Sequence, residues 1–370
     1  MREHFEKDLF ELNEIAQKDI ANQQSPELAD NEELLQFSEA LEEKLNKLAY
    51  DYHTGEETQK IIYNLQKEKQ KQMQQLKANL QAVEKSRYQK EILPNERFVT
   101  YSQETNNFVY TDERGKTQAV TFGEIVTDLD WGLNYYLDPA TTPKLIIKKY
   151  LVEKTKKQLL ELLNKQIITS ETGGDLALPQ RQKVYSIVEK RLVQGAETRP
   201  WGLYAEIMVK NFLKKLSLDK KLPFDIKEAD IFQDVEEKID FIIHKKEWLR
   251  GVKVGIDNRV QDIGIQFTVD PQKIAEKKRQ IERSKQILRS KKENVQDIAL
   301  VVFPFKTAFS LKKKWEQKGR PAGGPDKFLY RHHAERLFRK LLKDIFPAAE
   351  IEEYWQQIKD TFVEEPQKTT

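Results

Sequence analysis

Cysteine is absent from this chain, and glycine is scarce. The 370 residues include 14 glycines and no cysteine. A chain without cysteine can form neither disulfides nor thiolate metal sites, and it has no thiol nucleophile. The composition therefore predicts a protein of a reducing compartment, the cytoplasm. Little glycine alongside much Lys, Glu, Gln and Leu also favours a helix-rich chain.

Long apolar runs are missing too. No stretch approaches the ~18 apolar residues of a membrane-spanning helix, and the N-terminal sequence MREHFEKDLFELNEIAQKD lacks the apolar core of a secretory signal. We expect a soluble protein with no membrane partner. The glycine patterns of phosphate and dinucleotide loops, the spacing of zinc ligands and the G-x-S-x-G nucleophile motif are also absent from the sequence.

Aromatic residues and an uneven charge are what the chain does have. Its 18 Phe, 13 Tyr and 5 Trp indicate at least one packed core. Residues 1–57 contain sixteen acidic and five basic residues, a local charge of −11. Because the whole chain has a net charge of +3, the remaining residues together carry +14. An acidic head on a basic body is typical of a protein whose body meets a polyanion, although solvated helical faces would give the same charges.

The first 93 residues form the first predicted domain, a helical hairpin or short coiled coil. Apolar residues recur at helical spacing in a first segment, and a second helix is predicted from about Glu57 to Ile92. Four residues of that second helix alternate steps of three and four, as in a short heptad seam. The region is expected to hold a protein partner or a second copy of the chain. The two apolar sets are Leu34, Leu35, Phe37, Leu41, Leu45 and Leu48, and Met73, Leu76, Leu80 and Val83.

Residues 94–180 are predicted to be a small β-meander followed by basic helices and a linker. Strands are expected over 97–102, 107–111 and 117–122, with a turn at 112–115. Helices follow over 124–136 and 143–165, and the second of these has seven Lys against two Glu. The segment TSETGGDLALP, residues 169–179, is the expected linker.

Residues 181–350 are predicted to be an α/β domain, followed by a C-terminal tail over 351–370. The expected elements are helices over 182–192 and 203–216, strands over 224–229, 238–244 and 263–269, a helix over 271–289, a strand over 297–303 and a helix over 332–346. Strands mixed with a crossover helix indicate a mixed α/β sheet. The element order from residue 203 is α-β-β-β-α-β with an added helix.

Three polar side chains fall within this order. Glu206 lies in the first helix, Asp240 interrupts an apolar strand, and Gln266 interrupts the next strand. A charge in a strand that otherwise reads as buried must be paired or bind a cation. Because strand residues alternate between faces, Gln266 shares a face with Gly264 and Thr268.

These residues resemble the motif of the PD-(D/E)XK nuclease superfamily. That pattern is a helix with Glu, a strand with Asp, a strand with (Glu/Gln)-x-Lys, then a helix and a strand. The resemblance covers roughly residues 182–346 and implies a restriction-endonuclease-like core. It further implies that Asp240, Gln266 and Glu206 hold Mg²⁺ or Mn²⁺, and that the carbonyl of Phe267 completes the site. Such a metal neutralises charge at the scissile phosphate and activates water.

The chain departs from that pattern at the lysine. Thr268 stands at the expected position, so a relocated lysine is needed, and Lys273 in the first turn of the next helix is the leading candidate before Lys277 and Lys253. All three could equally be surface lysines. Structural alternatives also exist for the motif residues: ion pairs of Asp240 with Lys238 or Arg259 and of Glu206 with Lys210, and a buried backbone partner for Gln266.

Basic helices beside this site suggest a nucleic-acid partner, with DNA favoured over RNA. Residues 273–292 hold nine Lys or Arg against two Glu, and Phe309 and Trp315 lie in the next basic segment, where they could stack on bases or anchor a helix to its core. Three functions compete: a metal-dependent nuclease, an inactive relative that binds nucleic acid, and an interaction protein with a coiled-coil head. The residues expected to contact nucleic acid are Lys277, Lys278, Arg279, Arg283 and Lys285.

Overall fold

The computed structural model describes residues 56–85, 92–93, 95–112, 115–171, 201–229, 237–246, 262–291, 295 and 297–364. Several predictions fall elsewhere in the chain. The apolar segment 34–48, the linker residues 172–179, the helix expected over 182–192, and Lys253 and Arg259 all lie outside these described residues.

The chain divides into two units. The first unit combines residues 1–85 with 145–166, and the second combines 86–144 with 167–370. In the first unit the described helices are α3 (Glu56–Glu84) and α5 (Lys144–Glu171). Leu76 and Val83 of the predicted seam are buried, and Lys148 of α5 forms an ion pair with Glu84 of α3. The helix is confirmed, while α5 groups with the N-terminal region instead of with residues 94–180.

The second unit begins with a small four-stranded sheet. Its strands are β1 (Glu96–Ser102), β2 (Asn107–Thr111), β3 (Thr117–Val120) and β4 (Asn134–Leu137), in the order β3-β2-β1-β4. The antiparallel meander β1-β2-β3 is as predicted, and β4 adds a strand parallel to β1.

The helix expected over 124–136 is wrong in its second half. The structure has α4 (Phe122–Asp128) and a short 3-10 helix η1 (Leu129–Trp131), and then β4. Gly132 ends the helical stretch with a left-handed φ of 77°, which glycine adopts without steric cost. The residues that follow, Tyr135 and Tyr136, are aromatic and suit a half-buried strand.

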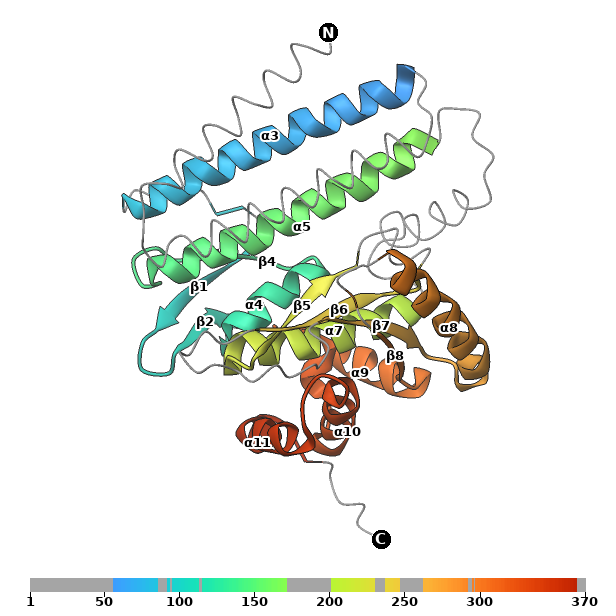
Figure 1. Ribbon diagram of the computed structural model, residues 1–370. Coiled ribbons are helices and arrows are strands. Elements are labelled where there is room, and N and C mark those ends of the chain that lie inside the picture. The colour runs from blue at the N-terminus through green and yellow to red at the C-terminus, as the bar shows by residue number, and fades with distance from the viewer. Residues whose placement is uncertain are drawn as a thin grey trace, which may run out of the picture. The chain divides into compact units, whose positions relative to one another are not determined.

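A second four-stranded sheet forms the main domain (Figure 1). Its elements are α7 (Trp201–Lys220), β5 (Phe224–Glu228), β6 (Phe241–Lys245), β7 (Asp262–Thr268), α8 (Ile274–Lys291) and β8 (Asp297–Val302), so the predicted α-β-β-β-α-β order is confirmed. The strands lie in the order β5-β6-β7-β8, antiparallel from β5 to β7, with β8 parallel to β7.

The two faces of this sheet have different helical covers. Ile263, Ile265 and Phe267 of β7 belong to the large core, which includes residues of α7, α9 (Phe305–Gln317) and α10 (Arg331–Leu342). The opposite face forms a smaller cluster with α8. Gly264 lies on that side because a Cβ there would come within 2.9 Å of the Ile239 side chain. Alternation along β7 therefore turns Gln266 toward the α8 side.

Helix α11 (Ala348–Ile358) corrects the expected C-terminal tail. Ile351, Trp355 and Ile358 are buried in the large core, so the residues up to 358 belong to the packed domain. The 3.6-residue period of these apolar side chains places them on one helical face.

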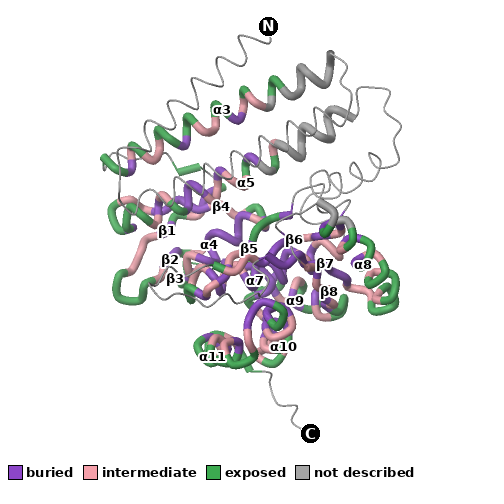
Figure 2. The backbone as a smooth tube through the Cα atoms, viewed as in Figure 1, coloured by how far each residue is buried: buried purple, intermediate pink, exposed green. Residues whose placement is uncertain are grey.

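Figure 2 shows the burial concentrated in α7 and the strands it covers. Among the described helices, none combines the length and apolarity needed to cross a membrane.

Candidate functional site

Asp240 joins the two central strands of the main sheet. It lies just before β6, and its backbone N–H donates to the carbonyl of Ile265 at 2.8 Å. Its carboxylate Oδ2 accepts the backbone N–H of Phe267 at 2.5 Å. The Asp240 carboxylate is thus held beside the Gln266-Phe267-Thr268 segment, with which the sequence analysis grouped it in one predicted site. Lys238, two residues earlier, has a left-handed φ of 60°, so the chain enters β6 with a sharp local bend.

Gln266 is almost fully buried, with 1% of its surface exposed. Its side-chain oxygen Oε1 is buried and has no hydrogen-bond partner. A buried acceptor without a donor is costly, so this oxygen does not serve the structural role considered from sequence, that of satisfying a backbone group. Amide and carboxylate oxygens are the kind of ligand that a hard cation favours.

Thr268 occupies the position where the resemblance demands lysine, and its hydroxyl has a local structural task. Its Oγ1 accepts the backbone N–H of Asp270 at 3.2 Å, and the Asp270 carboxylate then accepts the N–H of Gln272 at 2.9 Å. These turns end β7 and start the 3-10 helix η3 (Pro271–Lys273). Thr268 therefore shapes the exit from the strand.

Glu206 comes from the opposite side of the sheet. It is partly exposed on α7, the helix that covers the large core, whereas Gln266 points to the α8 side. Lys210, considered as its partner from sequence, has 7% of its side chain exposed and pairs with Asp130 at 3.2 Å and Glu228 at 2.5 Å. The structure brings Asp240 to the Gln266 segment directly. Glu206 could join them only around an end of the sheet.

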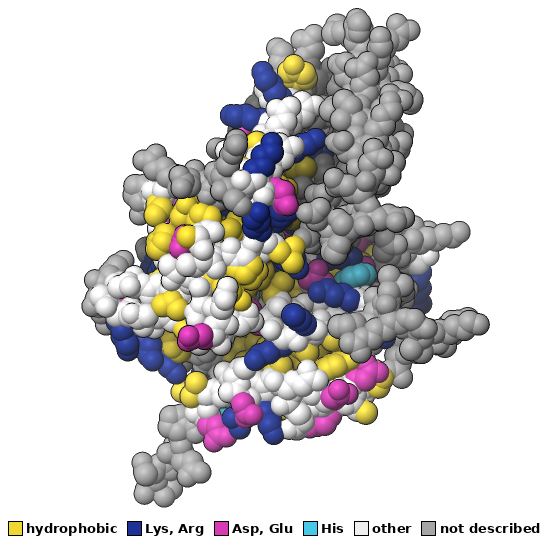
Figure 3. All heavy atoms as spheres, turned by 90° about the vertical axis from the view of Figure 1, so that its left-hand side faces the viewer, with side chains coloured by type: hydrophobic (Ala, Val, Ile, Leu, Met, Phe, Trp, Pro, Cys, Tyr) yellow, Lys and Arg dark blue, Asp and Glu magenta, His cyan; other side chains and the backbone are white. Residues whose placement is uncertain are grey.

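The candidate lysine and the predicted phosphate-binding residues are at the surface. Lys273 is exposed in η3, directly after the β7 exit. On α8, Lys278, Arg279 and Arg283 are exposed and Lys277 is half-buried. Lys285 is held by an ion pair of 2.7 Å with Asp297 of β8. On the face drawn in Figure 3, basic side chains are spread among hydrophobic and acidic ones.

Trp315 is a core residue, which settles one of the two aromatic alternatives. It is 5% exposed, and its indole N–H donates to the carbonyl of Pro321 at 2.8 Å. The role in base stacking considered for it from sequence is therefore wrong. Phe309, on the same helix, is 45% exposed, so its ring is accessible for stacking on bases.

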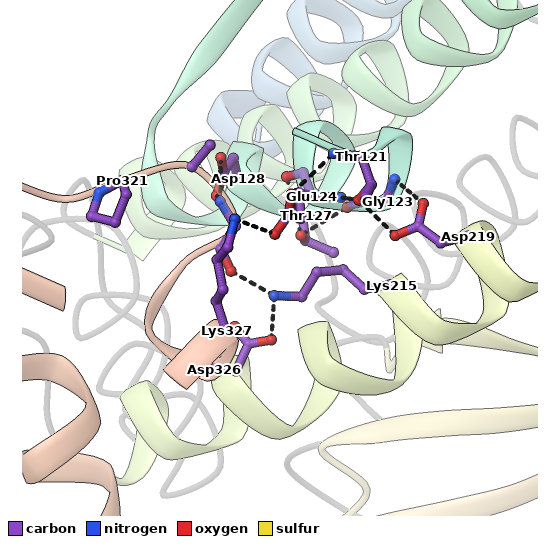
Figure 4. A network of polar contacts seen from close by, with 12 residues as sticks. Thr121, Gly123, Glu124, Thr127, Asp128, Lys215, Asp219, Pro321, Asp326 and Lys327 are labelled. Atoms are coloured by element: carbon purple, nitrogen blue, oxygen red, sulfur yellow. Dashed lines mark hydrogen bonds and ion pairs between the residues drawn. The ribbon is translucent and has the colours of Figure 1, made fainter. Parts of the chain in front are cut away.

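A buried polar network forms a second cluster of ionisable residues (Figure 4). It joins α4, α7 and the loop 321–326, in which the residues from Ala322 to Asp326 are buried. Gly323 donates its backbone N–H to both carboxylate oxygens of Asp128 at 3.0 Å. Lys215 forms an ion pair with Asp326 and donates to the carbonyl of Gly323 at 2.5 Å.

Two glycines let this loop approach the network closely. Gly323 and Gly324 have left-handed φ angles of 94° and 66°. A Cβ on Gly323 would lie 2.4 Å from the Glu124 carboxylate, and one on Gly324 would lie 2.4 Å from the Trp131 indole nitrogen. Only glycine fits either position, since both the backbone angle and the space exclude a side chain.

The same network clamps the N-terminus of α4 to the end of α7. Asp219 accepts the Thr121 hydroxyl at 2.6 Å and the backbone N–H of Gly123 at 2.7 Å. Thr121 and Glu124 form a capping box, in which each side chain accepts the other's backbone N–H. Lys327 pairs with Glu124 at 2.8 Å. The contacts of the network run between α4, α7 and the loop, and only Asp326 of the labelled acids has a buried oxygen, Oδ1, with neither a hydrogen bond nor an ion pair. We therefore assign the network to holding the small sheet on the main domain.

Burial raises the pKa of Asp128 from 3.8 to about 7. The hydrogen bonds from Tyr135 and Gly323, and the charge of Lys215, oppose the shift without cancelling it. The Tyr135 pKa is raised as well, because that phenol is buried and donates to Asp128. Asp128 is therefore protonated in the folded protein at pH values where it is ionised in the unfolded chain.

This shift predicts a stability that falls as pH rises from about 4 to about 7. The folded state holds a proton on Asp128 that the unfolded chain releases above pH 4, so the contribution is complete at low pH and lost through the folded pKa. Urea unfolding at about pH 5 and about pH 7.5 should show a loss of roughly 1 kcal/mol per pH unit.

The Asp128→Asn variant removes the titrating group while retaining an oxygen that accepts the Gly323 N–H. Its unfolding free energy should change less over the same interval than that of the wild type. The remaining acids, including Asp219, titrate in both proteins and cancel in the difference. Equal pH slopes for the two proteins would contradict the assignment.

Sequence reasoning missed this network because its members are far apart in the chain. Asp128 and Gly323 are separated by 195 positions, and Lys215 and Gly323 by 108. The available signal was the Gly-Gly pair followed by Pro-Asp, since adjacent glycines mark a backbone that must approach something closely. Glu237, buried three residues before Asp240, was also missed.

Within the described ranges, no group of three or more His, Cys, Asp or Glu residues is placed to hold a metal ion. The fold is a mixed α/β protein with two mixed four-stranded sheets. Comparison with family models, curated proteins and solved structures finds no match to the chain.

Proposed function

We propose that this protein is a divalent-metal-dependent nuclease that hydrolyses phosphodiester bonds of nucleic acid, preferably DNA. The observation that carries the proposal is the hydrogen bond from the Phe267 N–H to the Asp240 carboxylate, which holds the acid of one strand beside the Gln266 segment of the next. The α-β-β-β-α-β order and the parallel β7–β8 pair also support a nuclease core of the PD-(D/E)XK type.

The donor chemistry fits a hard cation. Mg²⁺ and Mn²⁺ favour oxygen ligands, and Mg²⁺ keeps several waters, so that one or two protein ligands and a substrate phosphate complete its shell. Asp240 would supply the charged ligand, and the buried, partnerless Oε1 of Gln266 a neutral one. Glu206 belongs to α7, on the other face of the sheet, and the proposal gives it no part in holding this ion. When bound, such an ion neutralises charge on the scissile phosphate and lowers the pKa of its water.

The chain's own residues have the remaining tasks. Lys273 is exposed directly after the β7 exit and would orient the phosphate or the attacking water, the role that Thr268 cannot fill without a positive charge. The exposed side chains of Lys278, Arg279 and Arg283 on α8 would bind the phosphate backbone through charge. Buried Gln266 and the Asp240–Phe267 bond keep the ligand oxygens in place between rigid strands.

The proposal predicts cleavage that requires added metal. Labelled single- and double-stranded DNA should be cut by the full chain with Mg²⁺ or Mn²⁺, and EDTA should abolish cutting because removal of the ion removes the charge that stabilises the transition state. Product formation on denaturing gels measures this. Intact DNA and RNA with both metals, or cutting that continues in EDTA, would contradict the proposal.

A second candidate is a nucleic-acid-binding protein that does not cut, and Thr268 is the observation that favours it. The hydroxyl of Thr268 is committed to the turn at Asp270, and the residue brings no charge to the site. This candidate predicts a gel shift that weakens steeply with salt, without cleavage under any metal condition. The same gels therefore separate the two functions.

A further inference from the structure

Three aromatic rings cluster where α7 and α9 begin. Trp201 is the first residue of α7, and Phe305 and Phe309 lie one turn apart at the start of α9. The ring centroid of Trp201 is 5.3 Å from that of Phe305 and 5.2 Å from that of Phe309, and the two phenylalanine rings stack at 6.1 Å with 27° between their planes. We call these three residues the aromatic platform.

Two of the three platform rings are exposed, and the third, Trp201, is half-buried against the large core. Phe305 is 43% exposed and Phe309 is 45% exposed. Large apolar rings that gather at a surface usually mark a site of interaction. The ring centroid of Trp201 lies 5.7 Å from that of Tyr204, which is buried, and this contact gives the platform a rigid support.

Positive charge surrounds the platform. Helix α9 carries four lysines against one glutamate, and Lys306 and Lys313 are exposed beside the phenylalanines. Lys312 lies with its Nζ 5.2 Å from the ring centre of Trp201 and 4.5 Å from that of Tyr204. Flat π-faces with cations around them match the two parts of a single strand of nucleic acid, the stacked bases and the phosphates.

The platform is connected to the candidate nuclease site through the backbone. The N–H of Phe303 donates to the carbonyl of Thr268 at 3.0 Å, and Phe305 follows two residues later. Phe305 therefore follows closely on β8, the strand that pairs in parallel with β7, which carries Gln266.

We propose that the aromatic platform stacks unpaired bases, so that the substrate is single-stranded nucleic acid or a single-stranded segment within a duplex. The inference rests on the proposed function for the identity of the ligand as nucleic acid, but it requires no cleavage. A duplex hides its base faces within its own stack, whereas a single strand offers them to aromatic side chains.

The test is binding in EDTA, where cleavage cannot interfere. A fluorescein-labelled oligothymidine, an abasic oligonucleotide of the same length and a duplex are titrated with the full chain, and anisotropy gives each Kd. The wild type should bind oligothymidine more tightly than the abasic strand and the duplex. In Phe305→Ala and Phe309→Ala, affinity for oligothymidine should fall by roughly 5- to 100-fold, with little change for the abasic strand.

A matched control is available in the small sheet. Phe98 is 44% exposed and stacks on Tyr136 at 5.9 Å, so Phe98→Ala removes an equally exposed, equally stacked ring away from the platform. It should leave all three affinities unchanged. Phe309→Tyr keeps an aromatic face and should retain binding. Circular dichroism spectra and melting curves confirm that each variant is folded.

Several results would overturn the inference. The first is equal affinity of the wild type for the abasic strand and oligothymidine. The second is a loss of oligothymidine affinity in Phe98→Ala as large as that in the platform variants. The third is unchanged binding in the platform variants with a change in the oligomeric mass of the protein in light scattering, which would indicate a contact between protein copies. Loss of oligothymidine binding in the platform variants, with no metal-dependent cutting by the wild type, would support the platform and reject the nuclease. Metal-dependent cutting by the wild type, with oligothymidine binding unchanged in the platform variants, would support the nuclease and reject the platform.

Discussion

Replacement of Asp240 by asparagine is expected to reduce metal-dependent DNA cleavage at least ~100-fold, the scale of losing one group that stabilises charge in a transition state. The substitution removes the negative charge that the proposed cation needs. It preserves an oxygen that can accept the Phe267 N–H, so the β6–β7 entrance should persist. Initial cleavage rates at saturating Mg²⁺ or Mn²⁺ measure the effect, with urea unfolding as the test of stability.

Alanine at the same position separates chemistry from structure. Asp240→Ala should lose activity as the asparagine variant does, and it should also lose about 1–3 kcal/mol of stability because the Phe267 N–H loses its acceptor. Asp225→Asn is the matched control, since this β5 acid accepts the backbone N–H of Ile226 at 2.9 Å but lies outside the proposed site. Full cleavage by Asp240→Asn, or an equal loss in Asp225→Asn, would remove Asp240 from the mechanism.

Replacement of Lys215 by methionine is expected to destabilise the fold by about 3–5 kcal/mol, the scale for breaking a buried ion pair on one side. The Lys215 side chain is 11% exposed and that of Asp326 is 1% exposed, so the carboxylate would be left buried without its cation. Burial alone would lower the pKa of Lys215, but the Asp326 and Glu124 carboxylates raise it above its ordinary value. The lysine is therefore charged in the folded state, and urea midpoints with a constant m value would report its loss.

A surface ion pair provides the comparison. Arg339 is 37% exposed and pairs with Glu335 at 2.8 Å and Glu352 at 2.6 Å. Arg339→Met should cost at most about 1 kcal/mol, because solvent screens exposed pairs. The double variant Lys215→Met, Asp326→Asn should recover part of the loss by removing the stranded charge. A Lys215→Met protein as stable as Arg339→Met would show that the network does not hold the loop.

The main sheet was predictable because its signals are local. Apolar runs of strand length predicted β5, β7 and β8 to within one residue at nearly every end, and the 3.6-residue period predicted α8. Asp240 and Gln266 stood out as polar interruptions of apolar strands, and register then placed them side by side. The strand around Asp240 begins later than expected, at Phe241, because Lys238 has a left-handed backbone that delays regular pairing.

Local signals failed where a distant partner decides the outcome. Tyr135 and Tyr136 continue a helical pattern in sequence, yet β1 supplies a parallel neighbour that makes them a strand. The loop 321–326 has the composition of a mobile turn, yet Asp128 and Lys215 hold it in the interior. Trp315 and Phe309 lie on one basic helix, and packing alone made the first a core residue and the second a surface residue.

The amino-acid sequence alone determined the order of helices and strands in the main domain, the face of each strand and the polar residues that interrupt the apolar strands, because periodicity and residue chemistry act over a few neighbouring positions. The tertiary structure alone decided which long-range partners meet: the acid of the strand entrance with the Phe267 amide, the glycine loop with its buried carboxylates, and the three rings at the start of α7 and α9. Such contacts depend on how faces pack across the whole chain, and no local pattern carries that information.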